Sequence, residues 1–289
     1  MPELPEVEGV VRQIRPVAIG KKIEDVFVSD TIRLSKAGGK EAILKKIETD
    51  NFIEQVKGSQ IVSVERRSKY IYFKLRKDGE FLLVNHLGMS GAWFYVGSLL
   101  SIPEEKFRKH VHVVLTLSDG NVLAYSDIRR FGEMRVLSEE GDYPPLLLMA
   151  PEPFAEGALQ HFLDMSESPK YRNKPIKEVI MDGQVISGAG NIYATEALFR
   201  MKIHPNRTAQ RISKKRRTEL FRAVVEILLE SIEVGGSTIS DYRNINGESG
   251  GMQNRFEMYG KKQCMACGNA TKTLKIGGRT SVYCPACQK

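Results

Sequence analysis

The first residues of the chain, Met-Pro-Glu-Leu-Pro-Glu, place an amine beside two carboxylic acids. Met1 precedes a small residue, so we expect its removal, which leaves Pro2 with a free secondary amine. An α-amino group has a pKa of roughly 7.7 to 8, so about a tenth of it is unprotonated near pH 7 and able to attack carbon. Glu3 and Glu6 lie within one helical turn of this amine and can transfer protons. The alternative is structural: the acids only favour the start of a helix.

All the cysteines of the chain lie near its end, in two Cys-x2-Cys pairs separated by 16 residues. Each pair can present two thiolates from a tight turn, and a hairpin between the pairs brings them to one point. The spacing therefore predicts one structural zinc ion, with no open coordination position, held by Cys264, Cys267, Cys284 and Cys287. Disulfide bonds are the alternative, which an intracellular location disfavours.

Two loops carry side chains suited to a disrupted base stack. Met89 lies between glycines in residues 85–91, and Arg129 and Phe131 lie in residues 126–132. Exposed Met, Arg and Phe side chains can wedge into DNA and fill the space left by a flipped nucleotide. Alternatively, Met89 and Phe131 belong to the core and the arginines to the surface.

Two further segments can bind phosphate. Residues 66–70, Arg-Arg-Ser-Lys-Tyr, bring three cations into a turn, and residues 186–191, Ile-Ser-Gly-Ala-Gly-Asn, precede a helical pattern. Glycines before a helix expose backbone N–H groups to an anion, and Asn191 can cap that helix and also donate to a phosphate. The alternative for residues 186–191 is a capped turn without a ligand.

The positive charge is concentrated in the last third of the chain. The net charge is +8, and residues 200–289 hold 17 Lys or Arg against 7 Asp or Glu, a balance of +10 that leaves −2 for the rest. Such a distribution is typical of a polyanion-binding face, although a solvated basic surface is also possible. No apolar run reaches membrane-spanning length and the N-terminus does not resemble a signal peptide, so we expect a soluble cytoplasmic protein that does not bind membranes.

The elements that must position these residues follow from periodicity. A helix is expected from about Glu6 to Ile14, ended by Arg15-Pro16 and Gly20. Alternating and β-rich runs predict a mostly antiparallel β domain. The predicted strands span residues 23–29, 61–66, 70–75, 81–85, 92–96, 111–117, 122–125 and 133–137.

A Pro- and acid-rich stretch then separates this β domain from helical patterns at residues 176–181, 191–201 and 213–234. The fold class expected is α+β: an antiparallel β-sandwich with an N-terminal helix, then a helical domain that ends in a zinc hairpin. The expected domain boundaries are 1–137 for the sandwich, 138–174 for the linker, 175–256 for the helical domain with a loop at 235–251, and 257–289 for the zinc finger.

These pieces together resemble the formamidopyrimidine-DNA glycosylase family (Fpg, or MutM), from Met1 to Lys289. Seven segments, in order, carry the resemblance: residues 1–8, 66–70, 86–91, 127–132, 188–198, 235–238 and 278–288. The resemblance implies a bifunctional DNA repair enzyme that excises oxidised purines from duplex DNA through a Pro2 iminium and cuts the strand by β and δ elimination.

Site residues also follow from the resemblance. It implies that Glu3 is the general acid/base, that Glu6 supports the same site and that Lys69 contacts the phosphate next to the lesion. Residues 188–198 then resemble part of a helix-two-turn-helix, and the loop at 235–251 resembles a lid over the flipped base. The DNA-binding residues implied are His86, Met89, Arg129, Phe131, Asn191 and Arg279, with Arg129 reading the opposite cytosine.

Two alternatives remain open, and one position departs from the family. A zinc-ribbon DNA-binding protein would not need Pro2 and Glu3, and the endonuclease VIII branch, which excises oxidised pyrimidines, usually has Gly where this chain has Leu4. Gly183 stands where the family usually has Gln, which bears on a backbone contact at that turn. The resemblance implies a monomer associated with the bacterial nucleoid.

Overall fold

The computed structural model describes residues 2–239 and 241–289, and in it the chain forms two compact units. Unit 1 comprises Met1–Leu147 and Gly235–Gly251, and unit 2 comprises Leu148–Val234 and Met252–Lys289. The loop at 235–251 therefore groups with the N-terminal residues, although in sequence it follows the last long helix. The expected removal of Met1 lies outside the described residues, as does Ser240 of the loop.

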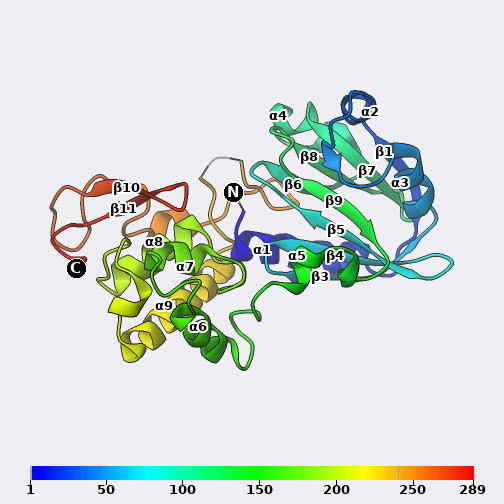
Figure 1. Cartoon of the computed structure of the whole chain (residues 1–289). Helices are drawn as coiled ribbons and strands as arrows, with labels where there is room; N and C mark the ends of the chain where they lie inside the picture. Colours follow the sequence, from blue (N-terminus) through cyan, green and yellow to red (C-terminus); the bar gives the residue numbers. More distant parts are fainter. Residues whose placement is uncertain (1, 240) are drawn as a thin grey trace. The chain divides into compact units, whose positions relative to one another are not determined.

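Unit 1 is a β-sandwich, as expected from the alternating sequence (Figure 1). One sheet has the order β1 (Ile23–Val28), β7 (Val111–Leu117), β8 (Val122–Asp127), β6 (Gly91–Val96), and all its pairs are antiparallel. The other has the order β2 (Ile43–Leu44), β9 (Glu133–Leu137), β5 (Glu80–His86), β4 (Tyr70–Arg76), β3 (Gln60–Arg67), with β2 and β9 parallel. Every predicted strand occurs within two residues of its expected ends.

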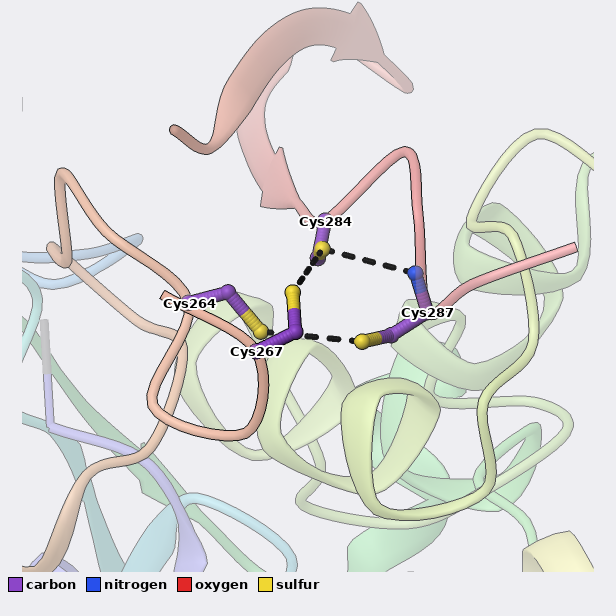
Figure 2. A group of neighbouring side chains, drawn as sticks. All are labelled: Cys264, Cys267, Cys284 and Cys287. Atoms are coloured by element: carbon purple, nitrogen blue, oxygen red, sulfur yellow. Dashed lines mark hydrogen bonds between the residues drawn. The ribbon is translucent and has the colours of Figure 1, made fainter. Parts of the chain in front are cut away.

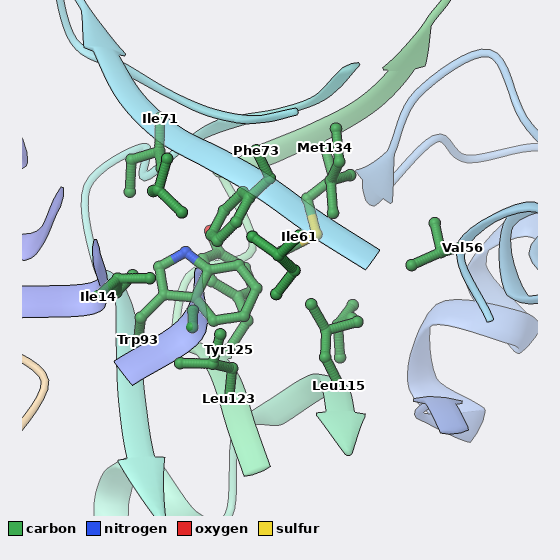
Figure 3. Close-up of a cluster of buried hydrophobic side chains, with 14 of the residues drawn as sticks. Ile14, Val56, Ile61, Ile71, Phe73, Trp93, Leu115, Leu123, Tyr125 and Met134 are labelled. Carbon is green, nitrogen blue, oxygen red and sulfur yellow. The ribbon is translucent and has the colours of Figure 1, made fainter. Parts of the chain in front are cut away.

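The N-terminal helix α1 (Leu4–Ala18) belongs to the core of this unit. Its buried positions Val7, Val10, Val11 and Ile14 recur with helical period, so one face packs on β3 and β4 of one sheet and on β6 of the other. The core between the sheets includes Trp93 (Figure 3). The indole N–H of Trp93 donates to Asn85 Oδ1 at 2.8 Å. The start of α1 is therefore held on a rigid scaffold.

The expectation that Arg15-Pro16 ends the first helix is wrong. Helix α1 continues to Ala18 with Pro16 inside its last turn. Proline removes one backbone N–H donor, and near the C-terminal end this affects a single bond, while Ala18 gains a fully buried position.

Several short elements of unit 1 are not predicted by the sequence. Strand β2 has only two residues, too few for a periodic signal, and the remaining helices are amphipathic over only one or two turns. These helices are α2 (Asp30–Ala37), α3 (Thr49–Val56), α4 (Glu105–Arg108), α5 (Pro144–Leu147) and the 3₁₀ turns η1 (Leu99–Ser101) and η2 (Glu140–Asp142).

Unit 2 is helical and ends in a two-stranded hairpin (Figure 1). Its helix α6 (Ala158–Glu167) falls in the stretch expected to be a linker, where prolines on both sides conceal the helical spacing of Ala158, Phe162 and Ser166. The other elements are α7 (Ile176–Met181), α8 (Asn191–Arg200), η3 (Ala209–Arg211), α9 (Lys214–Glu233), η4 (Met252–Arg255), β10 (Lys272–Ile276) and β11 (Arg279–Tyr283). In the part of the chain that the structure describes, no helix combines the length and apolar character needed to cross a bilayer.

Candidate active site and metal centre

Two buried carboxylates lie at the start of α1, next to Pro2. Glu3 is 2% exposed and is the N-cap residue of the helix, and Glu6 is 1% exposed. The Glu3 backbone N–H donates to Glu6 Oε2 at 2.8 Å, and the Glu3 side chain accepts from the Glu6 backbone, which makes a reciprocal capping box. The positive end of the helix dipole favours both acids here. Pro2 is itself buried, so the expected amine and Glu3 share an environment shielded from water.

Glu6 also fastens the loop at 235–251 to α1. Its Oε1 accepts from Ser237 N at 2.6 Å and from Ser237 Oγ at 2.9 Å, and its backbone carbonyl accepts from the Tyr242 hydroxyl at 3.2 Å. We call Glu6, Ser237 and Tyr242 the Glu6 clasp. Burial, reinforced by the charge of Glu6, raises the pKa of Tyr242, so its hydroxyl stays protonated and donates. Both Glu6 oxygens thus accept hydrogen bonds from neighbouring residues, an arrangement compatible with the support of the site that the resemblance implies.

A glycine is needed where the loop passes α1. Gly236 has φ of 81°, and a Cβ there would lie 3.0 Å from Glu6 Cγ. Further along, Tyr242 and Ile245 are buried in the sandwich core, and Tyr95 N donates to the Ile245 carbonyl at 3.3 Å. The loop is therefore anchored at several points in unit 1.

Lys69 lies in the turn between β3 and β4, and that turn is also tied to α1. Arg66 Nε donates to Glu8 Oε2 at 2.8 Å, and Arg66 Nη1 donates to the Ser68 carbonyl at 3.1 Å. Glu8 also accepts from Arg12 Nε at 2.7 Å. Burial would raise the pKa of Glu8, but its hydrogen bonds with Arg66 and Arg12 outweigh this and hold it below the usual value. A charged Glu8 thus fixes the position of the turn.

His86 ends β5 and lies opposite Tyr70 of β4, with ring centroids 4.8 Å apart. Burial lowers the pKa of His86 to about 4; the charge of Glu133 opposes this and that of Lys69 adds to it. His86 is therefore neutral at pH 7, and its Nδ1 accepts from Gly88 N at 3.1 Å, which leaves Nε2 as the protonated donor. In this state His86 can donate one hydrogen bond to a phosphate or sugar oxygen.

The structure brings the loop of Met89 together with the loop of Arg129 and Phe131, because one buried carboxylate holds both loops. Asp127, fully buried, accepts from Ser90 Oγ at 2.6 Å through Oδ1 and from Gly132 N at 2.7 Å through Oδ2. Ser90 Oγ in turn accepts from Arg129 N at 2.8 Å. The carboxylate therefore connects the backbone of the Arg129 loop to the loop that carries Met89.

The two loops also touch through their backbones. A Cβ on Gly88, which has φ of 63°, would lie 2.4 Å from Gly132 N, so only glycine fits there. Phe131 is 59% exposed, and the Arg129 guanidinium lies over its ring at 4.9 Å. The expectation that Phe131 is exposed thus fits better than the core alternative, whereas Met89 is only half-buried.

In unit 2 the structure links Asn191 to the hairpin that carries Arg279. The N-cap of α8 is Gly190, so Asn191 is the first helical residue and does not cap the helix with its side chain. Its Nδ2 donates instead to the carbonyl of Thr280 at 3.2 Å. Arg279, next to Thr280, is exposed at the start of β11.

The turn at Gly183 keeps a backbone contact without the Gln usual in the family. The carbonyl of Gly183 accepts from Ala150 N at 2.9 Å, and a Cβ at this position would meet open space. The departure at Gly183 therefore leaves this turn intact.

The four cysteines converge at the base of the hairpin (Figure 2). Their sulfur atoms all lie within 4.8 Å of one another, with Cys264 and Cys287 sulfurs 3.8 Å apart and Cys267 and Cys284 sulfurs 3.6 Å apart. Zn–S bonds of about 2.3 Å in a tetrahedron require sulfur separations of about 3.8 Å. The thiols therefore fit a single tetrahedral zinc ion and leave no position for a reactive ligand.

Sequence reasoning assigned no role to Glu8, Asp127 or Ser237. All three lie inside the short motifs used above, but a motif does not show which member contacts the reactants and which holds the backbone. An acid or hydroxyl next to a glycine, as Glu8 and Ser237 are, is a weak signal for the second role, since such residues often fix loops.

Comparisons with known proteins cover the whole chain. Residues 1–134 match the formamidopyrimidine-DNA glycosylase N-terminal domain, 149–243 its H2TH domain, and 261–289 a zinc finger found in FPG and IleRS. A formamidopyrimidine-DNA glycosylase of an Exiguobacterium species is 37% identical over 296 residues, covering 100% of both chains. The zinc-finger match, together with the sulfur geometry, confirms the predicted structural zinc site.

Two solved structures of Lactococcus lactis FPG, each 30% identical to this chain, cover 100% of both chains. One is a mutant protein in complex with DNA containing Fapy-dG, with a TM-score of 0.84. The other is the wild-type protein with DNA containing an oxidised pyrimidine, with a TM-score of 0.82. These matches confirm the predicted fold class.

Proposed function

Because the chain belongs to the formamidopyrimidine-DNA glycosylase family, we propose that it excises oxidised purines such as 8-oxoguanine and formamidopyrimidines from duplex DNA and then cuts the strand as a lyase. Family membership makes it an enzyme, a DNA glycosylase of base-excision repair. The purine preference, the lyase step and the residue roles below extend that assignment.

The proposed nucleophile is the free amine of Pro2. Its nitrogen forms a bond to C1′ of the damaged nucleotide as the bond from C1′ to the base breaks, and the base leaves with a proton. Opening of the sugar ring gives an iminium, whose positive nitrogen accepts electrons while a proton is lost from C2′ and the 3′ phosphate leaves. A second elimination releases the 5′ phosphate. Glu3, buried beside Pro2, transfers the protons.

The remaining site residues hold the DNA in this proposal. Lys69, His86, Asn191 and Arg279 contact backbone phosphates, which carry no sequence information but position the duplex. Met89, Arg129 and Phe131 occupy the space left by the flipped nucleotide, and Arg129 reads the opposite cytosine. We call Met89, Arg129 and Phe131 the wedge residues; the buried Asp127 supports them, because it holds both of their loops in one arrangement.

One observation carries the proposal: Pro2, Glu3 and Glu6 share a buried site at the start of α1, to which the 235–251 loop is fastened. A protein that only binds DNA has no need for such a site. The site does not determine which lesion enters, and one FPG relative has been crystallised with an oxidised pyrimidine in its DNA. The endonuclease VIII type of specificity is therefore the competing function.

A cleavage assay separates these functions. Duplexes with 8-oxoguanine opposite cytosine, with an oxidised pyrimidine, or undamaged, are incubated with enzyme in excess, and cut strands are quantified. We expect the 8-oxoguanine duplex to be cut fastest. Faster cutting of the duplex with the oxidised pyrimidine would indicate specificity of the endonuclease VIII type. If no duplex is cut, the protein only binds DNA.

The expected setting of this activity is the bacterial cytoplasm, at the nucleoid, with the enzyme acting as a monomer. A single copy supplies every residue in the proposed roles. Sedimentation of the free protein and of its complex with a lesion duplex tests the monomer.

A further inference from the structure

Unit 2 carries a dense run of positive charge that the proposed lesion contacts do not use. Residues 201–218 contain seven Lys or Arg and no Asp or Glu, and they connect the C-terminal end of α8 to the first turn of α9. We propose that Arg172, Arg207, Arg211, Lys214 and Lys215 form a second surface for the phosphates of undamaged duplex DNA, called the basic surface below. This inference rests on the proposed function only in that the enzyme must search duplex DNA for lesions.

The backbone beneath the basic surface is fixed. Ile176 N donates to the Arg207 carbonyl at 2.8 Å, and Gln210 N donates to the Arg172 carbonyl at 3.0 Å. Arg172 Nε and Nη2 both donate to Gln210 Oε1, at 3.2 and 3.1 Å. The segment that follows α8 is thus joined to the segment that precedes α7, and the cations project from an ordered surface.

Four of these cations have no structural task that would explain them. Arg207, Arg211, Lys214 and Lys215 are exposed, and within residues 2–239 and 241–289 their side chains make no hydrogen bond or ion pair. Arg216 differs, since it donates to the Met201 carbonyl at the end of α8. Lys214 and Lys215 also lie in the first turn of a 20-residue helix, where the helix dipole disfavours cations. Lys214 and Lys215 therefore lower the stability of this helix, and their presence despite that cost favours a role in binding.

A hollow in this surface provides an independent observation. Arg172, Gln210, Arg217 and Glu167 line a cavity of about 290 Å³. Arg217 is only 4% exposed; its Nη1 donates to Ser166 Oγ at 3.2 Å and its Nη2 pairs with Glu167, but its buried Nε has no partner among the described residues. Because Arg217 is paired with Glu167, the exposed Arg172 is the arginine of this hollow that a phosphate oxygen can reach.

The basic surface is separate from the phosphate contacts proposed for Asn191. Asn191 begins α8, whereas residues 201–218 follow its last residue, Arg200. Arg216 donates to the Met201 carbonyl, so the first turn of α9, with Lys214 and Lys215, lies near the C-terminal end of α8, and ten residues of α-helix span about 15 Å. Phosphates gripped at the Asn191 end are therefore not the ones that the basic surface contacts.

Duplex DNA is the ligand that this pattern fits best. The cations form a spread of exposed charges, and exposed basic surfaces of this kind exchange counterions with a regularly charged polyanion. An acidic protein segment would be the alternative partner, and polyglutamate represents it in the experiment.

The test is the salt dependence of binding to an undamaged duplex of about 40 base pairs, measured by fluorescence anisotropy. Each lost phosphate contact reduces the magnitude of the negative slope of log K against log salt by about 0.9. The variant Arg211→Ala/Lys214→Ala/Lys215→Ala should therefore lower the slope by about two to three. The matched control Lys57→Ala/Lys77→Ala/Lys109→Ala removes the same charge from exposed positions in unit 1 and should leave the slope unchanged.

Two further readouts separate this inference from the proposed function. Single-turnover excision from a short lesion duplex should be equal in the triple variant and the wild type, since the Asn191 end is untouched. If the wild type cuts nothing, the proposed function fails while the slope still tests the basic surface. Should the triple variant unfold, Lys215→Ala alone serves, with an expected change of about 0.9. Equal slopes for the triple variant and the control would overturn the inference. So would polyglutamate of matched charge that displaces labelled duplex from the protein as well as unlabelled duplex does.

Discussion

At the scale of single residues, Asp127 shows how a buried carboxylate can act on specificity without touching DNA. It holds Ser90 and Gly132, and through them the loops of Met89, Arg129 and Phe131. An amide at this position has one acceptor oxygen, so in Asp127→Asn either Gly132 N faces another donor, or the Ser90 hydroxyl turns to accept from the amide and its own proton loses its acceptor. A buried unsatisfied donor costs about 1–3 kcal/mol, and the loops should relax to avoid it.

We therefore predict that Asp127→Asn reduces discrimination between cytosine and adenine opposite the lesion by about tenfold or more, in line with that cost. Cutting at a preformed abasic site should change little, because Pro2 and Glu3 are not touched. Single-turnover rates with each opposite base measure this. Asp119→Asn, in an exposed turn of the same sheet, is the control, and equal behaviour of the two variants would contradict the positioning role.

His86 predicts a dependence of stability on pH. Its pKa is about 4 in the folded protein against an ordinary 6.5, so the unfolded chain binds more protons between these values. The contribution of neutral His86 is complete above pH 6.5 and is lost as pH falls toward 4. Denaturant unfolding of wild type and His86→Gln should give a stability difference that shrinks over this range. A pH-independent difference would contradict the burial of a neutral imidazole.

At the scale of elements, the Glu6 clasp connects a helix to a loop that begins 229 positions later in sequence. Helix α1 carries the proposed nucleophile at its start, and the loop is the proposed lid over the flipped base. Because the Glu6 carboxylate accepts hydrogen bonds from both elements, movement of the loop away from α1 would expose Glu6 to water or leave its Oε1 buried without a donor. The clasp therefore couples the position of the 235–251 loop to the start of α1.

Glu6→Gln should break this coupling, because an amide cannot accept from both Glu3 N and Ser237 N with separate oxygens. We expect faster amide hydrogen exchange in residues 236–251 and a lower excision rate, while Ser237→Ala, which keeps its backbone donor, should have a smaller effect. Hydrogen exchange followed by mass spectrometry measures the exchange rates, with Ser35→Ala in helix α2 as the control for loss of a serine hydroxyl. Unchanged exchange in Glu6→Gln would show that the clasp does not hold the loop.

The elements themselves show where sequence reasoning succeeds. Strands such as β4 and β7 are buried, rich in β-forming residues and bounded by turns, so the sequence pattern alone is sufficient to predict them. Helix α6 is missed because its spacing lies between prolines, and β2 because two residues have no period. The roles of Asp127 and Glu6 depend on contacts between residues distant in sequence, which periodicity does not contain.

At the scale of the whole molecule, the residues with proposed roles belong to different units. Pro2, Glu3, Lys69 and the wedge residues belong to unit 1, whereas Asn191, Arg279 and the zinc site belong to unit 2. The chemistry and part of the DNA grip can therefore be disturbed separately.

Removal of zinc should show this separation. The hairpin has a small core, Phe199, Met258, Cys264 and Cys284, so it depends on the metal for its order. A chelator that strips the metal should unfold residues 264–287 and abolish binding to lesion duplexes, while unit 1 keeps its exchange protection. Residues 257–259 should also stay protected, since the Glu196 carboxylate accepts from all three of their N–H groups. Added zinc should restore binding, and full protection of the hairpin without metal would contradict the prediction.

The central claim is that the amine of Pro2 attacks the sugar, and trapping with borohydride tests it most directly. Reduction converts an iminium to a stable amine, so the enzyme and an 8-oxoguanine duplex should give a covalent adduct that peptide mapping places on Pro2. An N-terminal extension converts the amine to an amide and should abolish trapping without unfolding the protein. An adduct on Lys69, or undiminished trapping by a protein that retains Met1, would contradict the account.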